Sequence, residues 1–288
     1  MTQAPRAPRL PDFVGIGAQR SGTSWIYACV AEHPEICAPE KEIGFFSIPD
    51  RWARGLGWYA DQFRACAASS VVGEYSTSYL YSPEAATRIA HCCPGARLLV
   101  SLRNPVDRAY SGFVNGLMSG ELAAGTDFEH ALDIEPQILD KSRYAKHLEK
   151  YLKLADRDKI LILIYEDALE DANGFLRRVY EFLGVDPGFE ASMTHRLVNP
   201  SRVPRSVGVD RATNAISARL RRAGLNKPWF MLKKLGVGDL IRAANTGRLA
   251  TRGTGLEPRT RARLVELFAP EVKELESMIA TDLGRWRR

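Results

Sequence analysis

The chain has 288 residues, of which 45% are hydrophobic and 9% aromatic, and its formal net charge is +6. This length and apolar content are enough to bury one large core, so a single domain is the simplest expectation. No apolar run reaches the length of a membrane span, and residues 1–9 lack the hydrophobic centre of a secretion signal. We therefore expect a cytoplasmic protein in which residues 1–11 form a disordered tail.

Residues 13–30 read as a buried strand, a glycine turn and a helix. Three glycines in this stretch let the backbone approach a ligand closely; they are Gly15, Gly17 and Gly22. The unpaired N–H groups of the first helical turn, supported by the helix dipole, favour an anion at the turn. The stretch therefore predicts a phosphate-binding cradle, although a plain glycine turn of an α/β protein is the alternative.

The glycine turn departs from the nucleotide-binding P-loop, G-x-x-x-x-G-K-[ST], at one position. Residues 17–24 keep the glycine spacing, but Thr23 stands where the lysine belongs. The nearest cation is Arg20, and no strand ending in an isolated aspartate supplies the usual magnesium ligand. We therefore expect an arginine-assisted, metal-free anion site and disfavour an ATPase or kinase.

The sequence signals for the next elements are weaker. Residues 34–68 are predicted to be irregular, and a short strand follows near residues 71–74. A helix should begin at about Pro83.

A second motif follows the apolar strand expected at residues 96–102. Arg103 comes directly after this strand, Asn104 suits the cap of the next helix, and Pro105 suits its first position. Ser111 lies two turns into that helix and is expected to reach the same anion. Because ligands of open α/β sheets bind at the carboxyl ends of strands, the motif predicts a second anion site on the same sheet edge. The alternative is an ordinary surface ion pair of Arg103.

The rest of the sequence continues the alternation of strand and helix. A helix is expected over residues 144–154, a strand over 160–165, and a helix from Ala172 that stops at Gly184. The predicted fold class is α/β, a P-loop-like central parallel sheet flanked by helices. Residues 201–263 hold fifteen Lys or Arg against three Asp or Glu, so we expect a basic helical arm over 201–255 and a C-terminal helix over 256–288.

The two anion motifs resemble the cofactor loops of sulfotransferases that use 3′-phosphoadenosine 5′-phosphosulfate (PAPS). The resemblance covers most of residues 12–200 and about the last thirty residues, so residues 12–288 are expected to form a sulfotransferase domain. It implies that the first loop holds the 5′-phosphosulfate and the second the 3′-phosphate. The residues implied for the first are Arg20, Ser21, Gly22, Thr23, Ser24 and Trp25, and those for the second are Arg103 and Ser111.

The chain looks most similar to the heparan-sulfate and bacterial carbohydrate type of this family. In that type the stretch written here as residues 41–46 carries the catalytic glutamate, which implies that Glu42 is the base. The alternative is that Glu42 is a solvated loop carboxylate, since Glu40, two residues away, looks equivalent to it. Arg202 and Arg205 lie where relatives bring a C-terminal loop onto the cofactor, and are expected to close over the 3′-phosphate.

Departures from the heparan type concern the acceptor. This chain has Gly44 where a histidine is usual and Tyr75 where a lysine is usual, so recognition of an acidic glycan is in doubt. Tyr75 and Tyr79 would suit a less charged sugar or an apolar acceptor, and sheet packing is their alternative. The resemblance thus implies transfer to a hydroxyl of a sugar, glycoconjugate or lipid-linked acceptor.

Other features limit the partners. The five cysteines include an adjacent pair and suit neither a disulfide framework nor a CxxC metal site, so all are expected to be reduced, and the five histidines lack metal-ligand spacing. The basic arm either covers the acceptor site, touches an anionic membrane or is a solvated face. No nucleic-acid-reading motif is present. The alternative function is a P-loop-like nucleotide-binding protein, either a small-molecule kinase or a non-catalytic adenosine bisphosphate binder.

Overall fold

The computed structural model describes residues 9–68, 70–123, 125–194, 203–204, 246–247 and 256–287. These residues form two compact units. The first unit contains residues 9–108, 140–194 and 265–287, and the second contains the described residues of 109–139 and 199–264. The sequence predicted one domain, and the described residues of that domain cluster into these two compact units.

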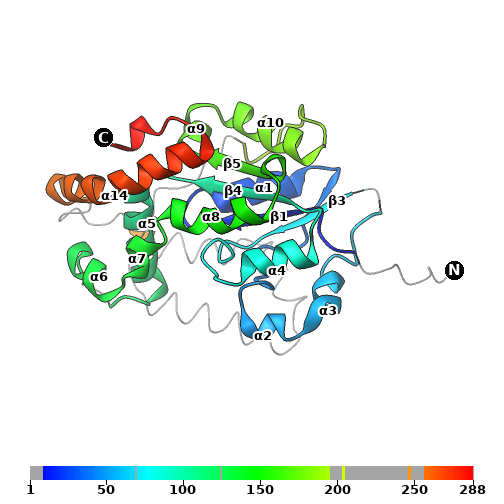
Figure 1. Cartoon of the computed structure of the whole chain (residues 1–288), viewed down its shortest axis with the longest axis horizontal. Coiled ribbons are helices and arrows are strands. Elements are labelled where there is room, and N and C mark those ends of the chain that lie inside the picture. Colours follow the sequence, from blue (N-terminus) through cyan, green and yellow to red (C-terminus); the bar gives the residue numbers. More distant parts are fainter. Residues whose placement is uncertain are drawn as a thin grey trace. The chain divides into compact units, whose positions relative to one another are not determined.

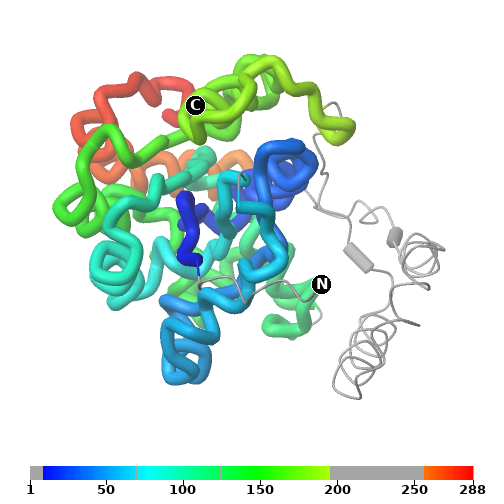
Figure 2. The backbone as a smooth tube through the Cα atoms, turned by 90° about the vertical axis from the view of Figure 1, so that its right-hand side faces the viewer, coloured from blue at the N-terminus to red at the C-terminus, as the bar shows by residue number. Residues whose placement is uncertain are grey.

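A parallel five-stranded sheet forms the centre of the first unit, which confirms the predicted α/β class (Figure 1). Its strands, in sheet order, are β2 (Ile36–Cys37), β3 (Val71–Tyr75), β1 (Phe13–Gly17), β4 (Arg97–Leu102) and β5 (Ile160–Ile164). The strand β1 is the central one and forms the dark blue part of the tube in Figure 2. Every residue of β1 is buried, as its apolar and glycine sequence predicts.

Helices cover both faces of this sheet. The α-helices of the first unit include α1 (Thr23–Glu32), α2 (Pro49–Trp52), α3 (Gly55–Asp61), α4 (Ala85–Cys92), α8 (Tyr144–Leu154), α9 (Tyr165–Glu170), α10 (Ala172–Leu183), the start of α5 (Pro105–Ser119) and most of α14 (Pro258–Ile279). The helices α1 and α10 pack on one face around a core that includes Trp25, Leu99 and Phe175. The helices α4 and α8 lie together on the other face (Figure 1).

The predicted helix ends are confirmed where a specific residue defines them. The side chain of Asn104 accepts the N–H of Val106 at 2.9 Å, so it caps α5, and Pro105 is the first helical residue. Gly184 ends α10 in the left-handed conformation with φ 75°. The strand β5 stops at Ile164, one residue earlier than predicted, because Tyr165 starts α9.

Two glycines allow β1 and β3 to pack closely around aromatic rings. A Cβ on Gly15 would lie 2.3 Å from the ring of Tyr75, and one on Gly73 would lie 2.3 Å from the ring of Phe13. The sequence attributed Gly15 to the close approach of a ligand, and the structure corrects this: the space above Gly15 is filled by Tyr75. The glycine is required by the packing of neighbouring strands.

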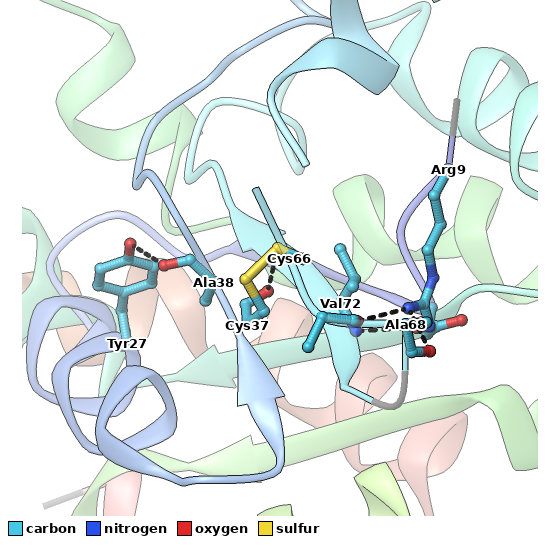
Figure 3. Close-up of a disulfide and its surroundings, with 9 residues drawn as sticks. Arg9, Tyr27, Cys37, Ala38, Cys66, Ala68 and Val72 are labelled. Atoms are coloured by element: carbon cyan, nitrogen blue, oxygen red, sulfur yellow. Dashed lines mark hydrogen bonds and ion pairs between the residues drawn. A yellow bond between two sulfur atoms is a disulfide. The ribbon is translucent and has the colours of Figure 1, made fainter. Parts of the chain in front are cut away.

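The chain is already packed at Arg9, two residues before the end of the predicted tail. The Arg9 guanidinium donates to the carbonyl of Ala68 at 3.1 Å and to the carboxylate of Asp12 at 2.7 Å, and Asp12 in turn accepts the N–H of Val72. Figure 3 shows these contacts beside the edge of the sheet. The predicted tail is therefore too long, because Arg9 has partners on residues far along the chain.

A disulfide joins Cys37 on β2 to Cys66 (Figure 3). The prediction that all cysteines are reduced is wrong for this pair, whereas Cys29, Cys92 and Cys93 are free. The error arose because the edge strand β2 lies in a segment predicted to be irregular, so nothing in the sequence placed Cys37 beside Cys66. Disulfides persist mainly in oxidising compartments, so this bond does not favour the cytoplasmic location expected from the sequence.

The second unit contains the rest of α5 together with α6 (Phe128–Ile134), most of α7 (Gln137–Asp140) and the start of α14 (Pro258–Ile279). Phe128 packs against Phe113 with ring centroids 5.2 Å apart, and Thr260 and Arg263 bind Glu129. Two short strands, β6 (Val203–Pro204) and β7 (Thr246–Gly247), pair antiparallel. The rest of the predicted basic arm lies outside the described residues.

The C-terminal helix α14 ends at Ile279, and a short 3₁₀ helix over Gly284–Arg287 follows, so the predicted helix over 256–288 is too long. The carboxylate of Glu271 on α14 accepts the N–H of Ala145 at the start of α8, 2.7 Å away. An acidic group at this position interacts favourably with the helix dipole. In the part of the chain that is described, none of the helices combines the length and apolar character that a membrane crossing requires.

The disulfide generates a stability prediction. Replacing both Cys37 and Cys66 with serine should lower the free energy of unfolding by about 2–4 kcal/mol, because the unfolded chain regains the freedom of a loop closed by residues 29 positions apart. Urea denaturation with and without dithiothreitol measures the effect. Wild type and a Cys92→Ser control should lose stability in reductant while the double variant does not change; equal stability of wild type in both buffers would contradict the prediction.

Candidate active site

The predicted site residues of the first unit lie at the carboxyl edge of the sheet. The chain leaves β1 into the turn that contains Arg20, leaves β4 at Arg103, and leaves β3 at Ser76. Because β3, β1 and β4 are adjacent and parallel, these three exits lie at one edge. This is the position at which open α/β sheets bind ligands.

The turn after β1 is held by neighbouring strands on both sides. The N–H of Ala18 donates to the carbonyl of Ser101 at 2.8 Å, and the Ser101 hydroxyl donates to the carbonyl of Ser21 at 2.8 Å. From the other side, the hydroxyl of Tyr75 donates to the carbonyl of Gly17 at 2.8 Å. The backbone of the turn is therefore fixed by β4 and β3 and does not depend on a ligand for its conformation.

The turn places the N-terminus of α1 at the sheet edge. Gly22 precedes the helix with φ 77°, and a Cβ there would lie 2.5 Å from the ring of Tyr165, so glycine is required for both reasons. No side chain caps this helix and its first turn has no acidic residue. Thr23 is buried and Ser24 is exposed. An uncapped N-terminus of a ten-residue helix can offer its N–H groups to an anion.

Arg20 and Arg103 meet at this edge. An Nη of Arg103 donates to the carbonyl of Arg20 at 3.5 Å, and the Arg103 guanidinium lies over the ring of Tyr165. Burial lowers the pKa of Arg20, and the charges of Arg103 and Arg108 lower it further. Cations that destabilise one another in a partly buried place favour a bound anion.

Arg108 is a site residue that the sequence analysis missed. Its side chain is 1% exposed, and its Nε donates to the hydroxyl of Ser142 at 2.6 Å, which in turn donates to the carbonyl of Pro105 at 2.9 Å. The signal was present, because Arg108 follows Arg103 by five residues on the helix capped by Asn104. Arginine is almost never fully buried unless it has partners, so its burial beside Arg20 strengthens the cationic character of the site.

Several residues hold Arg103 in place. The hydroxyl of Tyr144 donates to the carbonyl of Arg103 at 3.0 Å. The next N–H, that of Asn104, donates to the carboxylate of Glu166 at 2.8 Å, and Glu166 also accepts the indole N–H of Trp286 at 3.1 Å. The C-terminal 3₁₀ turn thus supports the strand end that carries Arg103.

Glu42 lies at the same edge, beside the end of β3. Its N–H donates to the carbonyl of Tyr75 at 2.8 Å, which continues the pairing of Lys41 with Tyr75. Its carboxylate accepts the N–H of Thr77 at 3.0 Å and the Thr77 hydroxyl at 2.9 Å, and it pairs with Lys41 at 2.9 Å. The side chain is 44% exposed, so the carboxylate is fixed and still accessible to a substrate. Thr77 was not identified from the sequence, since its role depends on the position of Glu42.

Three predicted ligand residues are packed into the protein instead. Trp25 is 3% exposed, its indole N–H donates to the carbonyl of Met193 at 2.9 Å, and its backbone N–H donates to Gly22. Tyr75 is 1% exposed and Tyr79 is 0% exposed. The structure therefore corrects the assignment of these side chains to cofactor or acceptor, because they pack in the interior.

Of the remaining predicted residues, Gly44 and Ser111 lie in the described part of the chain. Gly44 is buried, and its N–H donates to the hydroxyl of Ser76 at 2.8 Å. Ser111 lies on the part of α5 that belongs to the second unit, where its side chain is 5% exposed. Arg202 and Arg205 lie outside the described residues.

Comparison with known proteins identifies the family. The sulfotransferase domain family matches residues 10–201, which is more than half of the chain. The chain belongs to this sulfotransferase family. The predicted resemblance is confirmed, and with it the assignment of the parallel sheet to the sulfotransferase fold.

Two curated sulfotransferases illustrate the likeness in sequence. The chain is 30% identical over 185 residues to heparan sulfate glucosamine 3-O-sulfotransferase 3B1 of Mus musculus, which covers 62% of this chain and 47% of that protein. It is 29% identical over 204 residues to bifunctional heparan sulfate N-deacetylase/N-sulfotransferase 3 of Homo sapiens, covering 64% and 23%. The chain thus spans about half and about a quarter of the lengths of these two relatives.

A solved structure shows the likeness in fold. The sulfotransferase from Alicyclobacillus acidocaldarius matches with a TM-score of 0.70 and 25% identity, over 97% of this chain and 100% of that chain.

Proposed function

We propose that this chain transfers the sulfuryl group of PAPS to an acceptor hydroxyl. The observation that carries the proposal is the meeting of Arg20, Arg103 and the uncapped N-terminus of α1 at one sheet edge, with the carboxylate of Glu42 at the same edge. Membership of the sulfotransferase family supports it. A cationic cradle beside an accessible carboxylate suits a reaction in which an anionic leaving group departs while a hydroxyl is deprotonated.

The residues present fit a donor that carries several negative charges. Arg20 and the N–H groups at the start of α1 would hold the 5′-phosphosulfate, and Arg103 would hold the 3′-phosphate. PAPS supplies an activated sulfuryl group whose departure leaves adenosine 3′,5′-bisphosphate. The role of the protein is to bind the donor and to stabilise the negative charge that develops on the leaving phosphate. Cations and N–H groups that are already in place stabilise this charge without having to reorganise.

Glu42 is the proposed general base. A hydroxyl is a weak nucleophile at neutral pH, so a carboxylate within hydrogen-bond reach accelerates the reaction by taking its proton as the oxygen attacks. The two bonds from Thr77 hold the Glu42 carboxylate in one orientation, and its exposure leaves room for an acceptor.

The acceptor is proposed to be a hydroxyl of a sugar, glycoconjugate or lipid-linked molecule. The named relatives include enzymes of heparan sulfate, which supports a glycan. Tyr75 replaces the lysine of the heparan type, and its burial against Gly15 takes this position away from the acceptor altogether. A screen with radiolabelled PAPS should therefore include unsulfated heparosan chains, neutral oligosaccharides and a lipid-linked sugar.

Binding of the product is the first test. Calorimetric titration in magnesium-free buffer should show saturable binding of adenosine 3′,5′-bisphosphate, and Arg103→Ala should weaken it by about 10-fold or more, since a charge-assisted contact is lost. ATP is the control ligand. Absence of binding, or stronger binding of magnesium-ATP, would favour the kinase alternative, and binding without any transfer in the acceptor screen would favour a non-catalytic binder.

Removal of the first cation should affect the chemical step. Arg20→Ala should lower turnover by about 10²- to 10³-fold, the effect of losing one preorganised donor to a developing anion. The rate is measured with radiolabelled PAPS and the acceptor that gives the highest rate in the screen. Arg64→Ala, whose side chain is 72% exposed in a surface ion pair, is the control. Unchanged turnover in Arg20→Ala would exclude this role.

Substitution of the base should separate chemistry from binding. Glu42→Gln should abolish transfer while leaving the affinity for adenosine 3′,5′-bisphosphate nearly unchanged, because the amide keeps the shape of the side chain and cannot accept the proton. Glu40→Gln is the matched control, since Glu40 is the neighbouring exposed carboxylate. If Glu40→Gln loses activity and Glu42→Gln keeps it, the base has been misassigned.

A further inference from the structure

A buried carboxylate that the proposed reaction does not use lies next to the base. Glu74 on β3 is 0% exposed, and three hydroxyl groups surround it. The Tyr59 hydroxyl on α3 donates to Oε1 at 2.8 Å, the Tyr79 hydroxyl donates to Oε1 at 2.5 Å, and the Ser76 hydroxyl donates to Oε2 at 2.5 Å. Burying a carboxylate carries a free-energy penalty, which these three hydrogen bonds reduce. Glu74 therefore occupies this buried position at an energetic cost.

The Ser76 hydroxyl connects this carboxylate to the segment that carries Glu42. Its oxygen donates its proton to Glu74 and accepts the N–H of Gly44 at 2.8 Å. Gly44 is two residues after Glu42, and the next residue after Ser76, Thr77, holds the Glu42 carboxylate. Consecutive residues of the turn after β3 thus hold the backbone and the side chain of the base segment.

The backbone conformation of this segment is one that needs support. Glu42 has φ 62° and Gly44 has φ 61°, both in the left-handed region. For a residue with a side chain, such as Glu42, this region is unfavourable and persists when the surroundings fix it. The N–H of Gly44 therefore makes one of the bonds that fix this segment, together with the bond from the N–H of Glu42 to Tyr75 and the bond from the Arg51 guanidinium to the carbonyl of Glu42 at 2.7 Å.

We propose that Glu74 is a positioning residue for Glu42, acting through the Ser76 hydroxyl on the N–H of Gly44. A serine hydroxyl rotates freely and can donate or accept. By taking the Ser76 proton, the Glu74 carboxylate leaves a lone pair of the Ser76 oxygen directed at Gly44, and the charge-assisted bond makes that oxygen a stronger acceptor. This inference rests on the proposed function, in which Glu42 is the base.

The protonation of Glu74 adds a readout. Burial and, to a smaller extent, the charge of Glu42 raise the pKa of Glu74 to about 7, against the lowering effect of the three hydroxyl bonds. Other titratable groups that interact with Glu74 are Tyr59 on α3, Tyr79 after β3, Tyr27 on α1 and Cys93 after α4. Above about pH 7 the ionised Glu74 accepts from Ser76; below it, the protonated form can donate to the Ser76 oxygen and compete with Gly44.

The test compares Ser76→Ala with Tyr59→Phe. Each variant removes one hydroxyl donor from Glu74, and only Ser76→Ala removes the acceptor of Gly44. With radiolabelled PAPS and the acceptor found in the screen, Ser76→Ala should lower kcat by about 10- to 100-fold with unchanged KM for PAPS, whereas Tyr59→Phe should keep kcat within about 3-fold. Equal losses in both variants, or an unchanged kcat in Ser76→Ala, would overturn the proposal.

Two further measurements keep the proposal separate from the proposed function. Hydrogen exchange of the Gly44 amide, which needs no substrate, should be about 10-fold faster in Ser76→Ala and Glu74→Gln than in wild type and Tyr59→Phe; equal exchange in all four would refute the link even if no acceptor is found. In wild type, kcat should rise with pH near pH 7 as Glu74 ionises. In Glu74→Gln this rise should disappear. A Glu42→Gln variant that retains transfer would instead refute the base assignment while leaving the exchange result valid.

Discussion

The parallel pairing of β3, β1 and β4 is the constraint on which the site depends. Parallel strands bring their carboxyl ends to one edge, so residues far apart in the chain meet there without any contact of their own. The strands β1 and β3 can pair because Gly15 and Gly73 have no side chains and leave room for the rings of Tyr75 and Phe13. A side chain at either glycine would push β1 away from β3, and the turn after β1 would lose the bond from Tyr75 to Gly17.

The edge divides into a cationic half and a carboxylate half. Arg20, Arg103 and Arg108 lie near the ends of β1 and β4, and burial together with the charges of the other two arginines lowers the pKa of Arg20. Glu42 and Glu74 lie at the end of β3, where hydroxyl and amide donors surround both. Such a separation of charges suits a reaction that develops negative charge on one partner and removes a proton from the other.

Local sequence was sufficient to predict the elements whose own residues fix their backbone conformation. The β1 turn and the Arg103 helix start were predictable because glycine, asparagine and proline act on their own backbone, and both were confirmed. The β2 strand and its disulfide were not, since a two-residue edge strand has no periodicity and its cysteine partner is 29 residues away. Thr77 acts only through Glu42, which the fold brings beside it, so the sequence carried no signal for it, whereas the position of Arg108 five residues after Arg103 was a usable signal.

The disulfide also gives the base segment a distinct topology. Residues 38–65 leave the sheet edge at Cys37 and return to it at Cys66, so that they form a covalently closed ring carrying Glu42, α2 and α3. A change of length within a closed ring alters loop entropy only slowly and does not shift the register of the strands outside it. The cationic half of the edge lies outside this ring, so the ring can change in length without lengthening or shortening the segments that carry Arg20 and Arg103.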